Sequence, residues 1–258
     1  MSLVDKGAND FMFKYKTVDG VVTILGFKNK CFSENLVIPE FINGNPVHYV
    51  AAGAFRGLPI KSLVANSILS VKDYAFNQCE LENIELLNCL FVGDNSFSNN
   101  SLRSIFLPAC KEIMFQSFAG NLIRSVDVGL CKKFGVGAFY DNHIELLNSP
   151  ACETYADNCF ARNKLNTVVL KSGCQTGVSS FDDGVRLVNG GSKGVVVNRF
   201  VALYKRSPKR LGDILVFRVN HPRRLAQDYF VAEHRGFVAV GGFLKEAVLN
   251  LRNMLQTG

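Results

Sequence analysis

The chain has 258 residues, of which 48% are hydrophobic and 20% are charged, with 29 Lys and Arg against 22 Asp and Glu. This length suffices for one large domain or two smaller ones with a buried core, and the apolar content excludes an intrinsically disordered chain. Three features of the composition are unusual: 21 Phe with no Trp, 8 Cys, and a net charge of +7.

No apolar run reaches the roughly 18 residues that a membrane-spanning helix needs, so the sequence predicts no transmembrane segment. The first residues also lack the basic stretch followed by an apolar one that opens a secretory signal. We therefore expect either a cytoplasmic protein or a secreted one whose leader has been removed, and the compartment stays open.

Residues 1–48 precede the first regular repeat, and we expect them to form an N-terminal cap. From residue 49 onward the chain repeats itself every 21 residues. A Phe preceded by a small residue recurs at seven equally spaced positions: Phe55, Phe76, Phe97, Phe118, Phe139, Phe160 and Phe181. A fixed period of this length is the signature of a leucine-rich repeat solenoid.

Most repeats also contain the apolar pattern L-x-x-L-x-L, as in Leu102-x-x-Ile105-x-Leu107. Apolar residues two apart point to one face of a short strand, and a single unit of 21 residues cannot bury that face alone. We therefore predict a leucine-rich repeat solenoid of about seven coils over residues 49–189. Its short parallel strands stack in register, and the repeated Phe side chains fill its interior.

Half of the cysteines follow the same period, at Cys89, Cys110, Cys131 and Cys152. Stacked coils would bring neighbouring Cα atoms to about 5 Å, a separation that permits disulfides. The alternative, which we favour because Ile68 occupies the same position in the first repeat, is a column of buried thiols. No C-x-x-C pair occurs, so we expect neither a zinc site nor any other metal or cofactor.

An asparagine column lies three residues after the Phe column, at Asn100, Asn121, Asn142 and Asn163. Asparagine tolerates left-handed backbone and can hydrogen-bond to neighbouring main chain. We therefore expect these residues to form the turn into the next strand, with a ladder of ligand-binding amides as the alternative.

One segment reads Val37-Ile-Pro-Glu-Phe-Ile-Asn-Gly-Asn-Pro-Val-His-Tyr-Val50 and leads into Gly53-Ala54-Phe55. It resembles the start of the repeats in BspA-type bacterial leucine-rich repeat proteins. The resemblance covers about residues 20–187. It implies a right-handed solenoid with a strand on one face and irregular turns on the other, and a role in surface adhesion or partner binding rather than catalysis. The period of 21 is shorter than the family's commoner one.

The strand positions expected to face solvent define a candidate binding surface. Charges of both signs alternate along it, which favours a protein or glycan partner over nucleic acid. Apolar and guanidinium side chains are the usual anchors of such interfaces. The candidate partner-binding residues are Arg103, Phe106, Arg124, Asp127 and Leu146. The alternative is an ordinary solvated sheet face.

The 21-residue pattern stops after the Gly-rich stretch 190–194. Residues 190–258 contain 12 Lys and Arg against 4 Asp and Glu, a net charge of +8, whereas residues 1–189 carry −1. About 65 residues are marginal for an independent core, so we expect a small, basic α+β domain at 190–258 that covers the last solenoid coil.

Within this domain, composition and periodicity predict strands at 195–204, 214–219 and 237–240, and helices at 222–234 and 244–255. Its basic residues could neutralise phosphates, so binding of nucleic acid or another polyanion is the alternative function. The candidate polyanion-binding residues are Lys205, Arg206, Lys209, Arg210, Arg218, Arg223 and Arg224.

Catalytic motifs are missing from the sequence. His48, His143, His221 and His234 form no H-E-x-x-H pair, and neither G-x-S-x-G nor a Walker-type glycine loop occurs. We therefore expect a non-enzymatic protein that recognises a macromolecular partner.

Overall fold

The computed structural model describes residues 12–28 and 33–188 with their side chains, together with the backbone of Asn189 and of four later strands. The chain divides into two compact units, residues 1–194 and residues 195–258. Each unit is described by itself below.

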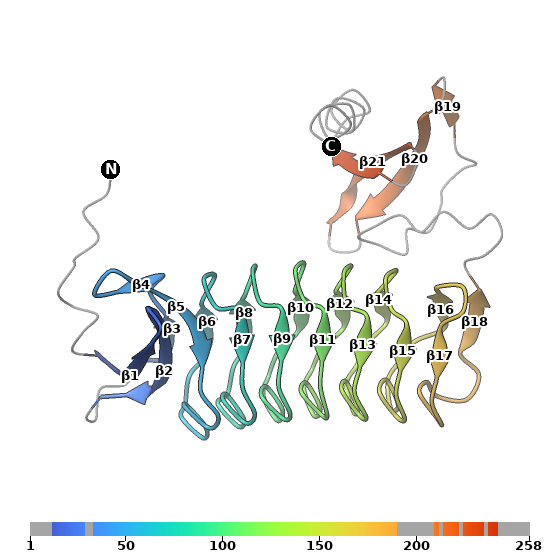
Figure 1. Ribbon diagram of the computed structural model, residues 1–258. Coiled ribbons are helices and arrows are strands. Elements are labelled where there is room, and N and C mark those ends of the chain that lie inside the picture. The colour runs from blue at the N-terminus through green and yellow to red at the C-terminus, as the bar shows by residue number, and fades with distance from the viewer. Residues whose placement is uncertain are drawn as a thin grey trace. The chain divides into compact units, whose positions relative to one another are not determined.

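The first unit is a parallel β-solenoid with a repeat of 21 residues (Figure 1). One strand of each coil joins a continuous ten-stranded sheet along the solenoid. The strands of this sheet, in spatial order, are β1 (Phe13–Val18), β2 (Val21–Phe27), β5 (Asn45–Val50), β7 (Ser70–Val71), β9 (Phe91–Val92), β11 (Glu112–Ile113), β13 (Lys133–Phe134), β15 (Thr154–Tyr155) and β17 (Gln175–Thr176), with β4 (Phe41–Ile42) paired to β5.

A second row of strands lies on the other side of each coil and corresponds to the L-x-x-L-x-L pattern. It is divided into three short parallel sheets: β3 (Asn35–Val37), β6 (Ser62–Val64) and β8 (Asn83–Glu85); then β10 (Ser104–Phe106), β12 (Ser125–Asp127) and β14 (Leu146–Asn148); then β16 (Thr167–Leu170) and β18 (Arg186–Asn189). The sequence prediction of a leucine-rich repeat solenoid is therefore confirmed.

The irregular turns expected away from these strands are present in each coil, as at residues 73–78, but each coil also contributes a strand to the longest sheet of the unit, which was not predicted. Its short strands pair in register, for example Ile113 with Phe134. They form because each coil places an apolar, mostly β-branched or aromatic residue five positions before the repeated Phe. Such residues fit a pleated, half-buried surface.

The solenoid pairing begins before residue 49. The hairpin β1–β2 is antiparallel, but β2 then pairs in parallel with β5, and β3 pairs in parallel with β6. Part of the stretch 1–48 that we assigned to a cap thus continues both rows of strands toward the N-terminus.

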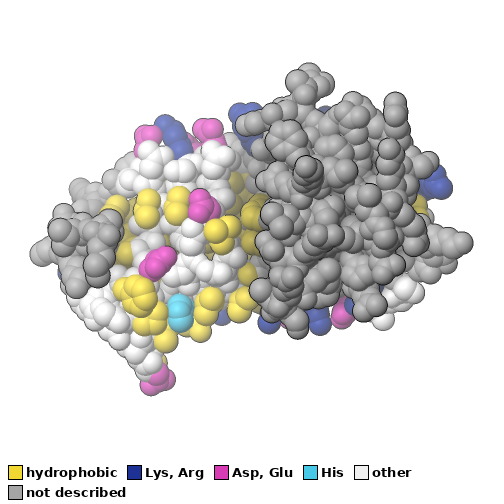
Figure 2. All heavy atoms as spheres, turned by 90° about the horizontal axis from the view of Figure 1, so that it is seen from above, with side chains coloured by type: hydrophobic (Ala, Val, Ile, Leu, Met, Phe, Trp, Pro, Cys, Tyr) yellow, Lys and Arg dark blue, Asp and Glu magenta, His cyan; other side chains and the backbone are white. Residues whose placement is uncertain are grey.

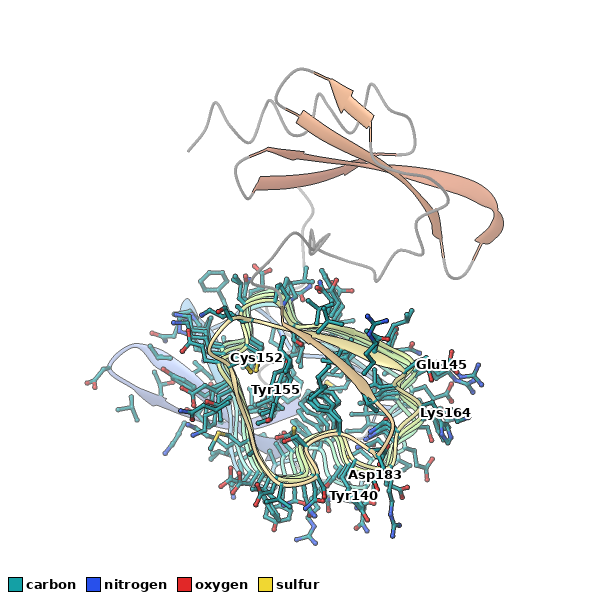
Figure 3. The ribbon with its side chains drawn as sticks, turned by 90° about the vertical axis from the view of Figure 1, so that its right-hand side faces the viewer. Tyr140, Glu145, Cys152, Tyr155, Lys164 and Asp183 are labelled. Carbon is teal, nitrogen blue, oxygen red and sulfur yellow. The ribbon has the colours of Figure 1, made fainter. Side chains whose placement is uncertain are left out.

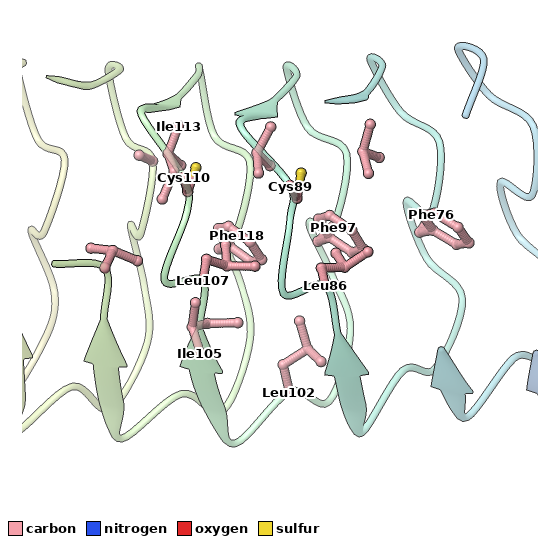
Figure 4. Packing of buried hydrophobic residues seen from close by; sticks show 14 of the residues in the cluster. Phe76, Leu86, Cys89, Phe97, Leu102, Ile105, Leu107, Cys110, Ile113 and Phe118 are labelled. Carbon is pink, nitrogen blue, oxygen red and sulfur yellow. The ribbon is translucent and has the colours of Figure 1, made fainter. Parts of the chain in front are cut away.

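The repeated Phe side chains form a stacked ladder through the centre of the solenoid (Figure 4). The rings of Phe76 and Phe97 lie 5.3 Å apart and are 7° from parallel, and those of Phe97 and Phe118 lie 5.2 Å apart at 4°. All seven are buried, which confirms the prediction that they belong to the core. The contact distance follows from the coil spacing, since in-register parallel strands stack about 4.8 Å apart.

The predicted cysteine column is also buried, and its members are free thiols, as we favoured. Viewed along the solenoid axis, Cys152 and Tyr155 point into the interior, whereas Glu145 and Lys164 point outward (Figure 3). The Tyr155 hydroxyl satisfies its hydrogen-bonding capacity inside the core, 2.7 Å from Ser149 Oγ. Within the described residues, neighbouring coils are therefore held together by packing and hydrogen bonds rather than by disulfides.

The asparagine column has a different geometry from the one expected. Every central coil has two left-handed backbone positions four residues apart. The asparagine column occupies neither of them. The two left-handed columns are Gly53, Tyr74, Asn95, Gln116, Gly137, Asn158 and Ser179, and Gly57, Gln78, Asn99, Gly120, Asp141 and Arg162. Asn100, Asn121, Asn142 and Asn163 each follow directly after a residue of the second column.

These asparagine side chains instead bond main chain in the solenoid interior, which confirms the second half of the expectation. Asn121 Nδ2 donates to the carbonyl oxygens of Phe97 and Phe118, at 3.0 and 3.1 Å, and its Oδ1 accepts from Leu102 N at 3.1 Å. Buried amides and carbonyls at the turn are thereby satisfied. The role is structural, because no amide of this buried column is left over for a ligand.

The second unit contains a four-stranded antiparallel sheet in the order β19–β20–β21–β22. Its strands are β19 (Lys209–Leu211), β20 (Ile214–His221), β21 (Arg224–His234) and β22 (Phe237–Gly241). The strands predicted at 214–219 and 237–240 are confirmed. The helix predicted at 222–234 is wrong, because Arg224–His234 forms β21, which pairs with β20 and, from Phe230 to His234, with β22. The segments 195–204 and 244–255 lie outside the described residues.

Candidate functional site

The candidate partner-binding residues lie on the middle sheet of the second row. Strands β10, β12 and β14 are parallel and in register, so that Ser104, Ser125 and Leu146 form one row across the sheet. The preceding residues are stacked as well: Arg124 N donates to Arg103 O at 3.0 Å, and Glu145 N donates to Arg124 O at 2.9 Å. The two arginines thus extend from adjacent coils on the same side of the sheet.

Arg103 immediately precedes β10, and Phe106, the last residue of that strand, pairs with Asp127 on β12. The Phe106 side chain is 39% exposed. Asp127 is half-buried and accepts a hydrogen bond from Asn148 Nδ2 at 2.8 Å. Two neighbouring coils therefore bring these residues together: Phe106 and Asp127 lie on β10 and β12, and Arg103 and Arg124 immediately precede those strands.

Two residues of this face are less accessible than the sequence suggested. Leu146, expected to be an exposed apolar anchor, is half-buried, and Asn148 is 8% exposed. Both lie on β14, where Asn148 Nδ2 donates across to its register partner Asp127 on β12. The exposed part of the candidate surface is therefore centred on β10 and β12.

The basic charge of this face is carried by the two arginines. Both are exposed, and among the residues that the structure describes neither guanidinium forms an ion pair. Further toward the N-terminus, Lys61 pairs with Glu34 at 2.7 Å, and this hydrogen bond raises the pKa of the lysine. Positive charge at β10 and β12 is thus available to an outside group.

Six of the seven cysteines in the described part of the solenoid are buried, and Cys174 is half-buried. Desolvation raises the pKa of the Cys89 thiol to about 11 and that of Cys152 to about 12, so these thiols stay protonated at neutral pH. In the described part of the chain, no three His, Cys, Asp or Glu side chains are grouped to hold a metal ion. Nor do the described residues include a helix with the length and apolar character to cross a membrane.

The polyanion-binding candidates are described only in part. Lys209 and Arg210 lie on β19, Arg218 lies on β20 and Arg224 begins β21. Lys205, Arg206 and Arg223 are outside the described residues. Lys209 and Arg210, expected in a connection between strands, instead pair with Val216 and Leu215 of β20.

One surface feature was missed by the sequence reasoning. A groove of about 380 Å³ lies where the chain passes from β6 and β8 to the long sheet, beside the hairpin of β4 and β5. Leu69 and Leu90 contribute to its lining. Leu69 and Leu90 are 21 residues apart, so the sequence does show that they share a column. That this column lines a groove depends on the hairpin of β4 and β5, which lies outside the repeat.

A family model described as the BspA type leucine-rich repeat region matches the chain in six copies, over residues 26–145 and 92–187. The chain belongs to the BspA-type leucine-rich repeat family. This family membership confirms the resemblance inferred from the segment that leads into the repeats.

Two solved structures resemble this BspA-type chain, each over 69% of its length. One, titled as the pneumococcal vaccine antigen PcpA, is 17% identical with a TM-score of 0.45. The other, titled as a leucine-rich cell surface protein from Faecalibacterium prausnitzii A2-165, is 13% identical with a TM-score of 0.31, and 74% of it is covered. The present chain spans about half (48%) of the length of the first. No curated protein matches it.

Proposed function

We propose that this protein is a non-enzymatic recognition protein that binds a protein partner through the sheet face around β10 and β12. The observation that carries the proposal is the placement of Arg103 and Arg124 on adjacent coils beside the 39% exposed Phe106. An exposed aromatic ring flanked by guanidinium groups is typical of the residues that contribute most to protein interfaces.

The charge pattern supports a protein partner over a polyanion at this face. Acidic residues accompany the arginines, with Glu82 in the coil before Arg103 and Glu145 in the coil after Arg124. A phosphate backbone is attracted by a face of one sign, whereas mixed signs set the register of a protein interface. A glycan remains the alternative ligand for the same residues.

The test is quantitative capture of partners from the organism's own cells and medium by the full-length chain. We compare the wild type with a Phe106→Ser, Arg124→Glu double variant and with a matched Phe91→Ser, Lys133→Glu variant on the other sheet. The proposal expects a defined protein that the sheet-face variant loses and the matched variant retains. Equal capture by all three proteins would refute it.

A second candidate function is polyanion binding through residues 190–258, and the observation that favours it is their net charge of +8. Binding of this kind weakens steeply with salt because neutralised phosphates release counterions. Full-length protein is titrated with duplex DNA across a salt series, beside a variant with Lys205, Arg206, Lys209 and Arg210 changed to Gln. Absence of salt-dependent binding by the wild type at low ionic strength rejects this function.

A further inference from the structure

The edge of the solenoid between the two rows of strands contains an apolar groove that the proposed sheet face does not use. Its floor is formed by equivalent residues of successive coils, held in register by the main chain. Leu69 N donates to His48 O at 2.8 Å, Leu90 N to Leu69 O at 2.8 Å, and Lys111 N to Leu90 O at 2.9 Å. His48, Leu69 and Leu90 line the groove, and Lys111 occupies the same position one coil further along.

The hairpin of β4 and β5 forms one wall at the N-terminal end. Its two strands are joined at Asn43 and Gly44, whose φ angles of 50° and 79° are those of a tight hairpin turn. Phe41 on β4 lines the groove and is 60% exposed, which makes it one of the most exposed large apolar side chains in the described part of the chain. Figure 2 shows the hydrophobic side chains gathered beside a histidine on the face seen from above.

Amide and hydroxyl groups form the opposite wall. Asn88 Nδ2 donates to Asn66 O at 2.8 Å, and Asn66 Oδ1 accepts from Leu87 N at 3.1 Å, so the wall is fixed by bonds between coils. Ser67 Oγ, which belongs to the same wall, has no hydrogen-bond partner within the described residues. The wall is thus a fixed polar side of the groove, and its Ser67 hydroxyl oxygen is shielded from solvent.

The two ends of the groove differ in charge. Glu40 lines the end beside the hairpin, and its exposed carboxylate makes no ion pair within the described residues. Lys111 and, one coil later, Lys132 are exposed at the other end, where Lys132 approaches Glu153 at 3.8 Å. An acidic end, an apolar middle and a basic end therefore follow one another along the coils.

The length of this arrangement matches a short extended peptide. From the coil of His48 to that of Lys111 there are three steps, or about 14 Å at roughly 4.8 Å per coil. Four residues of extended chain cover about 13 Å at roughly 3.3 Å per residue. Glu40 marks the His48 end of the groove. In a bound peptide, a basic residue that pairs with Glu40 and an acidic residue that pairs with Lys111 would then be separated by three residues, two of which face the floor.

We propose that this groove binds an extended segment of a partner protein in which two apolar residues lie between a basic and an acidic residue. The apolar side chains cover Leu69, Leu90 and Phe41, the basic residue pairs with Glu40, and the acidic residue pairs with Lys111. The groove shares no lining residue with the sheet face around β10 and β12. The two proposals can therefore be tested independently.

The probes are fluorescein-labelled synthetic peptides with the core Lys-Leu-Thr-Leu-Glu, and two matched peptides whose ends are both Lys or both Glu. Fluorescence anisotropy of full-length protein at low salt measures the three affinities. We expect the mixed-charge peptide to bind about fivefold more tightly than either matched peptide, since each exposed pair contributes modestly. Glu40→Lys gives the groove two basic ends and changes the preference to the peptide with two Glu.

Leu90→Gln removes part of the apolar floor and weakens the binding of all three peptides by about tenfold or more. Asp183→Lys, an equal charge change at an exposed position outside both surfaces, leaves the order of affinities unchanged. Thermal melting of each variant shows that it remains folded. Equal affinity of the wild type for the three peptides, or an unchanged preference in folded Glu40→Lys, overturns the proposal. A wild-type dimer in sedimentation that Leu90→Gln dissociates also overturns it, because the occupant is then a second copy.

Discussion

The Asn121 side chain donates a hydrogen bond to the carbonyl oxygen of Phe97, one coil earlier, at 3.0 Å. The same bond recurs from Asn142 to Phe118 at 2.9 Å. Each coil therefore attaches its turn to the backbone of the aromatic residue that forms the core of the coil before it. The asparagine column and the phenylalanine column therefore act together to stack the coils.

Replacing Asn121 by Ala should destabilise the solenoid by about 3 kcal/mol, because buried main-chain groups of three residues lose their partner. Urea unfolding followed by circular dichroism measures the change. Asn83→Ala, on the exposed surface of β8, is the matched control and should change stability by less than about 0.5 kcal/mol. Similar losses for both variants would contradict a special role for the buried column.

Truncation of a phenylalanine at the centre of the ladder should lower the stability of the protein strongly. Phe97→Ala leaves a cavity between two stacked rings and should cost about 4 kcal/mol, whereas Phe106→Ala on the partly exposed sheet face should cost about 1 kcal/mol or less. Thermal and urea unfolding of the two variants provide the comparison. A smaller loss for Phe97→Ala than for Phe106→Ala would show that the ladder is not the core.

Gly135 marks a place where neighbouring coils approach too closely for a side chain. A Cβ added there would lie 2.6 Å from the Met114 carbonyl carbon and 2.7 Å from Phe115 N, and neither is the end of a flexible side chain. Gly135→Ala should therefore destabilise the protein by about 2 kcal/mol. The control is Ala156→Gly at the equivalent position of the next coil, which introduces no contact. Full stability of Gly135→Ala would show that the coils are spaced more widely.

The buried thiols should make the protein less stable in alkali. A thiol is neutral when protonated, and burial raises the pKa of Cys89 to about 11, so the folded protein retains a proton that the unfolded chain loses near pH 8.5. Below that pH the stabilisation is complete, and it is lost as the pH rises through 11. Urea unfolding between pH 8 and 11 should show a fall of up to about 1.4 kcal/mol per pH unit from this thiol.

Cys89→Val is the comparison for this pH dependence. Its free energy of unfolding should fall less steeply over the same range, because one proton fewer is released on unfolding. Identical slopes for the wild type and the variant would place the pH dependence in other groups.

Periodicity explains what could be predicted from the sequence. In a solenoid with a 21-residue repeat, residues that share a column stack directly, so the burial of Phe97, Cys110 and Ile105 follows from spacing alone. The same reasoning did not separate the left-handed Asn99 from the inward Asn100, because adjacent asparagines suit a turn equally well. Only the coil-to-coil hydrogen bonds distinguish them.

Features that depend on elements outside the repeat could not be predicted. The groove at Leu69 and Leu90 requires the hairpin at Phe41, which belongs to no repeat column. The repeat pattern also did not predict that Leu146 is half-buried or that Asn148 is buried and bonded to Asp127. In the second unit, pairing on both edges makes Arg224–His234 a strand, although its apolar spacing also suits a helix.

The central claim, that the face around β10 and β12 binds a protein partner, is tested most directly by site-specific photo-crosslinking. A photoreactive amino acid is placed at Arg103, Phe106 or Arg124, and in matched chains at Lys133, Glu112 or Phe91 on the other sheet. The crosslinked products are then measured in material from the organism. The proposal predicts one shared product at the three β10 and β12 sites that is missing at the three matched sites. Equal crosslinking on both sheets, or products confined to the matched sites, would contradict it.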